Sequence, residues 1–252
     1  MVDLSGAPSD AVVPDPRLLA RVRSLADAAR ADGRRRVLGI AGPPGSGKTT
    51  LVAALLAATA GDAGVAGHVA HVPMDGFHLL DADLVRLGRR DRKGAPDTFD
   101  AAAYAAALES VRELPRREVA APAFDHAVGE PQPGALVVPV QADVVVTEGN
   151  YLLLDDEAWR PVRDQLDEVW FCALADDVRV ERLVHRHVAA GRAPQDARAW
   201  VLRSDEANAA LVGPTALRAD VVVLDGRVVG PDADFGPDAD FRPEADPGPD
   251  ED

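Results

Sequence analysis

The sequence predicts an α/β fold in which a mostly parallel sheet is covered by helices on both faces. Two observations carry this prediction. Short β-branched apolar stretches alternate along the chain with longer segments of helical periodicity. A glycine-rich loop, AGPPGSGKTT at residues 41–50, joins one predicted strand to the helix that follows it. In such sheets ligands bind beyond the carboxyl ends of the strands, so polar motifs at those ends are the candidates for chemistry.

The predicted elements follow one another in a regular order. The strands span residues 36–41, 68–75, 143–154 and 166–174, and a hairpin around Asp225-Gly226 covers 220–229. The helices span residues 16–32, 50–56, 101–114, 176–191 and 194–212. Gly33 and Pro115 end the first and third of these helices, as glycine and proline commonly do.

Length and composition bound the class of protein. The chain has 252 residues, 47% of them apolar, which suits one α/β domain with small additions. Its single cysteine, Cys172, excludes an internal disulfide and suits a reducing compartment. The N-terminus is acidic and no apolar run reaches membrane-spanning length, so we expect a cytoplasmic protein that does not enter a membrane.

The net charge of −15 is unevenly distributed. Residues 231–252 hold nine carboxylates against one arginine and are rich in proline, so we expect a disordered acidic tail there. Residues 1–15 are expected to form a flexible leader and 16–230 the folded domain. The tail is read as solvated, with a partner-binding or autoinhibitory arm as the alternative. The rest of the chain is also acidic, which argues against nucleic acid as a partner.

The glycine-rich loop is the most informative motif. Residues 42–49 match G-x-x-x-x-G-K-[ST], the phosphate-binding P-loop, and stand between a strand and a helix as that motif requires. Inward-facing N–H groups and the helix N-terminus attract phosphate, Lys48 would reach the β- and γ-phosphates, and Thr49 would hold Mg²⁺. The predicted ATP-contacting residues are Gly42, Pro43, Pro44, Gly45, Ser46, Gly47, Lys48, Thr49 and Thr50.

The choice of lysine at position 48 supports this interpretation over a plain Gly/Pro-rich turn. The chain has 25 arginines and only two lysines, so a compact ammonium was retained where a planar guanidinium would not fit. The guanine-reading motif of GTPases, the basic groove of helicases and the signature loop of transporter ATPases are absent from the sequence. The strand at 143–148 ends in a lone acid, Glu148, which suits a small-molecule kinase.

Six motifs occur in one order along the chain: GPPGSGKT, MDGFHL (74–79), GAPDTFD (94–100), APAFDHAVGEP (121–131), TEGNYLLL (147–154) and RLVHRHVAAG (182–191). In this order they resemble the phosphoribulokinase, uridine kinase and bacterial pantothenate kinase superfamily, and within it the nucleoside/nucleotide kinase-like or fructose transport-system kinase proteins. The resemblance covers about residues 35–225. It implies a P-loop kinase fold with a helical lid that uses ATP and Mg²⁺ to phosphorylate a hydroxyl of a small metabolite.

The resemblance also implies roles for single residues. Asp75 would be the general base facing the acceptor hydroxyl, with turn capping as the alternative. Glu148 would hold Mg²⁺ together with Thr49. Arg182 and Arg186, on one face of a lid helix, would join Lys48 in stabilising the transferring phosphate.

Five residues lie in motifs that contact the acceptor in similar proteins, although turn capping or simple exposure would explain them equally well. They are Phe77, His78, Asp97, Asp125 and His126.

The acceptor itself stays open among a sugar, a nucleoside and a pantothenate-like compound. An accessory ATPase that couples nucleotide binding to a partner protein is the alternative from another class, and a uridine or pantothenate kinase is the nearer one. A homodimer is compatible with the sequence, which does not settle the oligomeric state.

Overall fold

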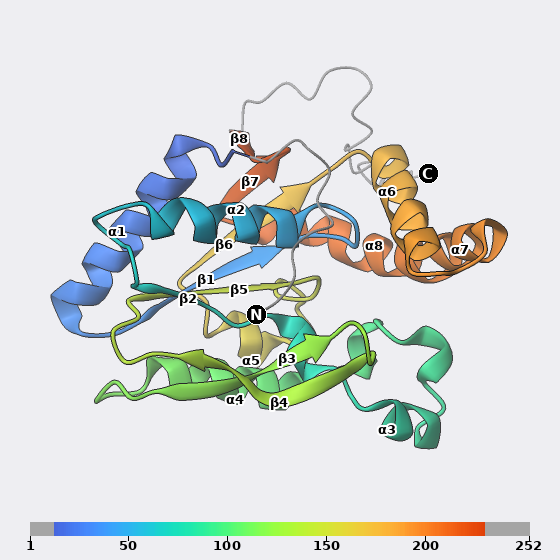
Figure 1. Ribbon diagram of the computed structural model, residues 1–252, viewed down its shortest axis with the longest axis horizontal. Coiled ribbons are helices and arrows are strands. Elements are labelled where there is room, and N and C mark those ends of the chain that lie inside the picture. Colours follow the sequence, from blue (N-terminus) through green and yellow to red (C-terminus); the bar gives the residue numbers. More distant parts are fainter. Residues whose placement is uncertain (1–12, 230–252) are drawn as a thin grey trace, which may run out of the picture.

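The computed structural model describes residues 13–229, which form a six-stranded sheet with helices on both faces (Figure 1). The strand order is β2-β5-β1-β6-β7-β8, and every pair is parallel except β7 with β8. This confirms the predicted fold class. Residues 1–12 of the expected leader and the whole of the expected tail lie outside the described residues.

The five parallel strands, β2, β5, β1, β6 and β7, place their carboxyl ends at one edge of the sheet. The strand bounds are β1 Arg36–Ala41, β2 Val69–His71, β5 Val144–Gly149, β6 Glu168–Ala173, β7 Val221–Leu224 and β8 Arg227–Val229. In β1, Leu38 and Ile40 face one layer of helices while Val37 and Ala41 face the other, as the two-residue period of a strand requires. Both faces are therefore buried.

Helices α1 (Pro16–Asp32) and α2 (Lys48–Ala60) cover one face. Asp15 accepts a hydrogen bond from the backbone N–H of Arg17 and so caps α1, while its own N–H donates to Gly226 O at 3.0 Å. Helices α4 (Ala101–Arg112) and α5 (Arg160–Arg163) cover the opposite face. None of the helices between residues 13 and 229 combines the length and apolarity needed to cross a membrane.

A two-stranded antiparallel ribbon, which the sequence did not predict, stands apart from the main sheet. It consists of β3 (Val119–Asp125) and β4 (Glu130–Val138), with an irregularity between Ala121 and Ala123. In Figure 1 the ribbon lies below the sheet, beside α4, and its tip reaches towards α3 (Asp81–Arg86). It adds a wall on the side of the molecule where the segment 74–100 lies.

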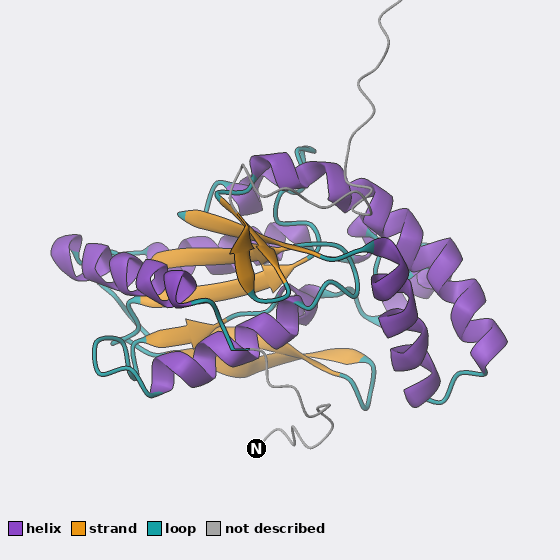
Figure 2. Cartoon of the chain, turned by 90° about the horizontal axis from the view of Figure 1, so that it is seen from above, coloured by secondary structure: helices purple, strands orange, loops and turns teal. Residues whose placement is uncertain are grey.

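The helical segment that the sequence predicted over residues 176–212 projects from the sheet edge as a lid (Figures 1 and 2). It contains α6 (Asp176–Ala189), α7 (Pro194–Trp200), a π-helical turn (Val201–Asp205) and α8 (Glu206–Val212). Buried Arg179 fixes its base, with Nη2 at 2.6 Å from Glu206 Oε1 and at 2.9 Å from Asp176 Oδ1. The arginine joins α6 to α8 across the base of the lid.

Candidate active site

The P-loop closes around the ammonium group of Lys48. Lys48 Nζ donates to the carbonyls of Gly42 and Pro43, at 2.9 Å each. Burial lowers the pKa of Lys48, and the charge of Glu148 partly offsets that effect. The ammonium group of Lys48 is thus held by the P-loop, and its charge lies close to Glu148, the predicted metal ligand.

Three glycines give the loop its shape. Gly42, Gly45 and Gly47 all have positive φ, at 147°, 81° and 92°. A Cβ on Gly42 would meet Cys172 O at 2.6 Å, and a Cβ on Gly45 would meet Leu183 Cγ at 2.8 Å. Side chains are excluded at Gly42 and Gly45 by both conformation and space, and at Gly47 by its positive φ alone.

The loop also offers an unused polar group. Ser46 is 7% exposed, and its buried Oγ has no hydrogen-bond partner among the described residues. A buried hydroxyl without a partner is costly unless a ligand or water satisfies it. The donor set therefore fits a phosphate held at the N-terminus of α2.

Thr49 and Glu148 meet beside the loop and offer oxygen ligands. Thr49 Oγ1 donates to Glu148 Oε2 at 2.9 Å. Glu148 is 8% exposed. Burial raises the pKa of its carboxyl; the charge of Lys48 and the hydrogen bond from Thr49 act against this rise, and the negative charge of Asp75 adds to it. Residues 13–229 contain no cluster of three or more His, Cys, Asp or Glu side chains suited to a metal. A site with a hydroxyl and one carboxylate fits Mg²⁺, which takes its other ligands from phosphate and water.

Asp75 lies just past the end of β2 rather than on it. The strand is shorter than predicted, and Asp75 belongs to a 3₁₀ turn, Met74–Phe77. Two close approaches lock this turn: a Cβ on Gly76 would lie 2.3 Å from Pro122 O, and one on Gly149 would lie 2.4 Å from Met74 Sδ. The turn is therefore wedged between the ribbon and the end of β5, with Asp75 exposed.

The carboxylate of Asp75 has neither a hydrogen bond nor an ion pair within residues 13–229. Its charge nevertheless raises the pKa of Glu148, and it acts in the same direction on Lys48. The structure thus brings Asp75, Glu148 and Lys48 into one electrostatic group at the sheet edge.

The lid arginines differ in their surroundings. Arg182 is 52% exposed, 3.7 Å from Asp225, and its Nη1 lies 4.0 Å from where a Cβ of Gly47 would be. Arg186 is exposed and has no ion-pair partner in the described part of the chain, and its charge contributes to lowering the pKa of Lys48. Arg179 is 1% exposed and reaches Pro44 O at 3.4 Å, so it supports the loop from behind.

The five predicted acceptor residues fall into different environments. His78 is partly buried, stacks on Phe99 with ring centroids 4.0 Å apart, and burial lowers its pKa. Phe77, only 7% exposed, packs against Tyr104 in the core, so its side chain contributes to packing.

The three remaining residues are engaged with their own loops. Asp97 pairs with Arg92 at 2.6 Å and Arg89 at 3.2 Å, and the hydrogen bond to Arg92 lowers its pKa. Asp125 accepts hydrogen bonds from the N–H groups of residues 127 and 128. It therefore caps the turn of the ribbon, which is the alternative role considered for it from the sequence. His126 follows in that turn and packs on Phe124, 5.2 Å between ring centroids.

Sequence reasoning missed His71, at the last position of β2. Its Nε2 lies 3.8 Å from Glu148 Oε1 and is buried without a hydrogen-bond partner among the described residues. Burial lowers its pKa to about 4, so the ring is neutral near pH 7. A histidine inside an apolar strand gave no signal, because its neighbour Glu148 comes from a distant part of the chain.

The fold and the site together define a P-loop protein. At one edge of its sheet lie the carboxylate of Asp75, the two side chains that offer oxygen ligands to a metal, Thr49 and Glu148, and a helical lid. A Phosphoribulokinase / Uridine kinase family model matches residues 37–230, and the chain belongs to this family of kinases. The resemblance that the six motifs indicated is confirmed.

Individual relatives agree with this assignment. YggC of Escherichia coli is 34% identical over 190 residues, which cover 75% of this chain and 78% of YggC. A Schizosaccharomyces pombe protein described as a candidate uridine kinase is 32% identical over 196 residues, 75% of this chain and 83% of its own. A solved structure from Silicibacter sp. TM1040, described as a candidate fructose transport system kinase, aligns with a TM-score of 0.72 and 32% identity, covering 81% of this chain and 98% of that one.

Proposed function

We propose that this protein is an ATP- and Mg²⁺-dependent kinase that transfers a phosphoryl group directly to a hydroxyl of a small metabolite. Membership of the family supports an ATP-dependent kinase, and the site geometry supports the direct route. The single observation that carries the proposal is the exposed carboxylate of Asp75, which has no partner within residues 13–229 and stands on a tightly packed turn close enough to Lys48 and Glu148 to act on their charges. A carboxylate on a tightly packed turn next to a phosphate site can serve a hydroxyl acceptor as a base.

Each group of residues has a separate role in the proposed transfer. The P-loop N–H groups, Ser46 and Lys48 hold the phosphates, and Thr49 and Glu148 would hold the metal. Mg²⁺, when bound, neutralises charge on the phosphate oxygens. Asp75 orients the acceptor hydroxyl and takes its proton while the acceptor oxygen bonds to the γ-phosphorus and the bond to the ADP oxygen breaks. Arg182 and Arg186 stabilise the charge on the oxygens in transfer.

The acceptor side is bounded by the 74–100 segment, the ribbon and α8. Lys93, the second of the two lysines, donates from Nζ to Asp81 Oδ1 at 2.6 Å and to Gly129 O at 2.7 Å, so it ties the segment to the tip of the ribbon. Asn208 Nδ2 on α8 donates to Gly94 O at 3.3 Å. These contacts hold the segment against the ribbon and α8 on the side where Asp75 lies. The residues leave the acceptor open among sugars, nucleosides and pantothenate-like compounds.

An ATP-consumption screen of the purified protein against hydroxylated metabolites tests the proposal. We expect at least one compound to raise ADP formation well above the basal rate, with phosphorylated product found by mass spectrometry. Lys48→Ala, run in parallel, should abolish the stimulation. Basal hydrolysis that no acceptor stimulates, together with a copurifying partner that does, would instead favour the accessory ATPase.

A further inference from the structure

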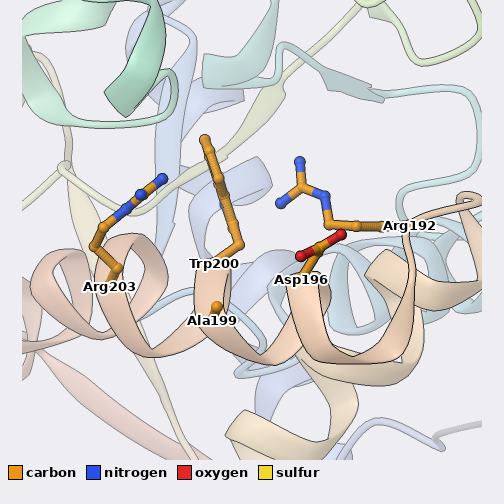
Figure 3. Close-up of a pocket in the computed structure, with 5 residues that line it drawn as sticks. All are labelled: Arg192, Asp196, Ala199, Trp200 and Arg203. Atoms are coloured by element: carbon orange, nitrogen blue, oxygen red, sulfur yellow. The ribbon is translucent and has the colours of Figure 1, made fainter.

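Two places outside the P-loop gather polar side chains that lack partners among the described residues. One is a small pocket in the lid, where the guanidinium carbons of Arg192 and Arg203 lie 4.4 and 5.3 Å from the ring centroid of Trp200. Figure 3 shows the two guanidinium groups on opposite sides of the indole, so their N–H donors do not converge on one ligand. The other is the strand end beside Glu148, where a single polar atom faces the proposed metal ligand.

His71 supplies that polar atom. It is the last residue of β2, and its Nε2 is buried without a hydrogen-bond partner in the part of the chain that the structure describes. Glu148 Oε1 lies 3.8 Å from it, which is beyond hydrogen-bond distance. Buried polar atoms are nearly always paired, so one without a partner points to a contact that forms when the site is filled.

The register of the sheet sets the direction from which His71 approaches. β2 runs parallel to β5, with His71 opposite Val146. Val146 and Glu148 are two residues apart on β5 and so project from the same face, which α1 and α2 cover. The ring therefore meets the carboxylate from the strand side, whereas Thr49, in the first turn of α2, meets it from the helix side.

The two oxygens of Glu148 have different neighbours. Oε2 accepts a hydrogen bond from Thr49 Oγ1 at 2.9 Å, and Oε1 faces His71. The gap between His71 Nε2 and Oε1 leaves no room for a bridging water, which would need about 5.5 Å between the two atoms. A direct contact requires a closure of about 1 Å, which a small rotation of either side chain can supply.

We propose that His71 is a positioning residue for the metal site. Its Nε2–H donates to Glu148 Oε1 when Mg²⁺ and ATP are bound, and so holds the carboxylate in the orientation that serves the metal. Hydrogen bonds of this kind to ligating groups are worth a factor of about 10–100 in metal affinity. The inference rests on the proposed role of Glu148 and adds to it a residue from outside the six sequence motifs.

Metal binding to the nucleotide complex tests this role without turnover. Mg²⁺ is titrated by calorimetry into the full-length protein mixed with a smaller amount of AMP-PNP, a non-hydrolysable ATP analogue. His71→Val removes the N–H donor but keeps a β-branched strand residue, and it should weaken Mg²⁺ binding about tenfold or more. His71→Gln keeps an N–H donor and should restore most of the Mg²⁺ affinity.

His68→Val is the matched control. His68 stands just before the start of β2, with Nδ1 2.9 Å from Asp143 Oδ2, so this variant also removes a histidine that lies beside a carboxylate. Its Mg²⁺ affinity should match that of the wild type, as should the AMP-PNP affinity of every histidine variant in EDTA. Circular dichroism verifies that each variant is folded, and His71→Ala gives the same comparison if the valine variant is not.

Each other outcome would overturn the proposal. Unchanged Mg²⁺ affinity in His71→Val, with a loss in Glu148→Ala, would keep the metal site and remove His71 from it. Unchanged affinity in Glu148→Ala would contradict the metal site itself. An equal loss in His71→Val and His71→Gln would make the ring a direct ligand or a packing element. A further loss on adding His71→Val to Glu148→Ala would mean that the histidine does not act through the carboxylate.

Discussion

Replacing Arg179 with alanine should destabilise the fold, because this arginine is a structural member of the lid. Its side chain is 1% exposed and lies at ion-pair distance from Glu206 and Asp176. Removing one partner of a buried pair costs about 3–5 kcal/mol. Glu206 is 30% exposed and Asp176 is 83% exposed, so water recovers part of the loss. The contact with Glu206 also lacks hydrogen-bond alignment. We therefore expect a loss of about 3 kcal/mol, at the lower end of that range.

Thermal unfolding followed by circular dichroism measures this loss. For a chain of this size 1 kcal/mol corresponds to about 2–4 °C, so Arg179→Ala should lower Tm by about 6–12 °C. Arg198→Ala is the matched control, since an exposed arginine without an ion-pair partner among the described residues should change stability by no more than about 0.5 kcal/mol. A Tm for Arg179→Ala within 2 °C of the control would refute the reasoning.

Four further outcomes are expected. Lys48→Arg should lose turnover, because the planar guanidinium does not fit the loop; wild-type activity in a coupled ADP assay would contradict this. Glu148→Gln should raise the Mg²⁺ concentration needed for half-maximal rate and be partly rescued by excess metal, whereas an unchanged Mg²⁺ titration would remove Glu148 from the metal site. Arg186→Ala should lower kcat while Tm stays within 2 °C, and a large fall in Tm would assign it a structural role instead. Burial lowers the pKa of His71 from 6.5 to about 4, so the unfolded chain binds that proton first and stability is lost as pH falls from 6.5 towards 4. In urea unfolding over this range, His71→Gln should reduce the loss by up to about 1.4 kcal/mol per pH unit, and an unchanged slope would contradict the assignment.

Much of the fold could be predicted because local signals agree with it. The bounds of α1 and β1 match the expected ones, since a capping aspartate, Gly33 and an apolar run mark them. The β3–β4 ribbon was missed because Pro122, Pro131 and Pro133 read as loop residues, and a two-stranded ribbon tolerates proline where a central strand does not.

The candidate site could be predicted only where a motif is contiguous. The P-loop carries its own signature, and Glu148 follows from the end of a buried strand. Arg179 and the lid residue Arg182 lie on the same helix, yet Arg179 is buried and Arg182 is half-exposed. This difference arises from the contact of α6 with α8, which the sequence does not reveal. Likewise Phe77 and His78 are neighbours in one motif, and the packing of Tyr104 and Phe99 decides which faces the core.

The most direct test of the account is steady-state kinetics of Asp75→Asn with the acceptor that the metabolite screen identifies, alongside calorimetric titration of ATP. Asp75 is exposed and unpaired within residues 13–229, so its replacement should leave the fold and ATP affinity almost unchanged. If it takes the proton of the acceptor hydroxyl, kcat should fall by about 100-fold or more. Full acceptor phosphorylation by Asp75→Asn would contradict the assignment of the base and, with it, the proposed mechanism of transfer.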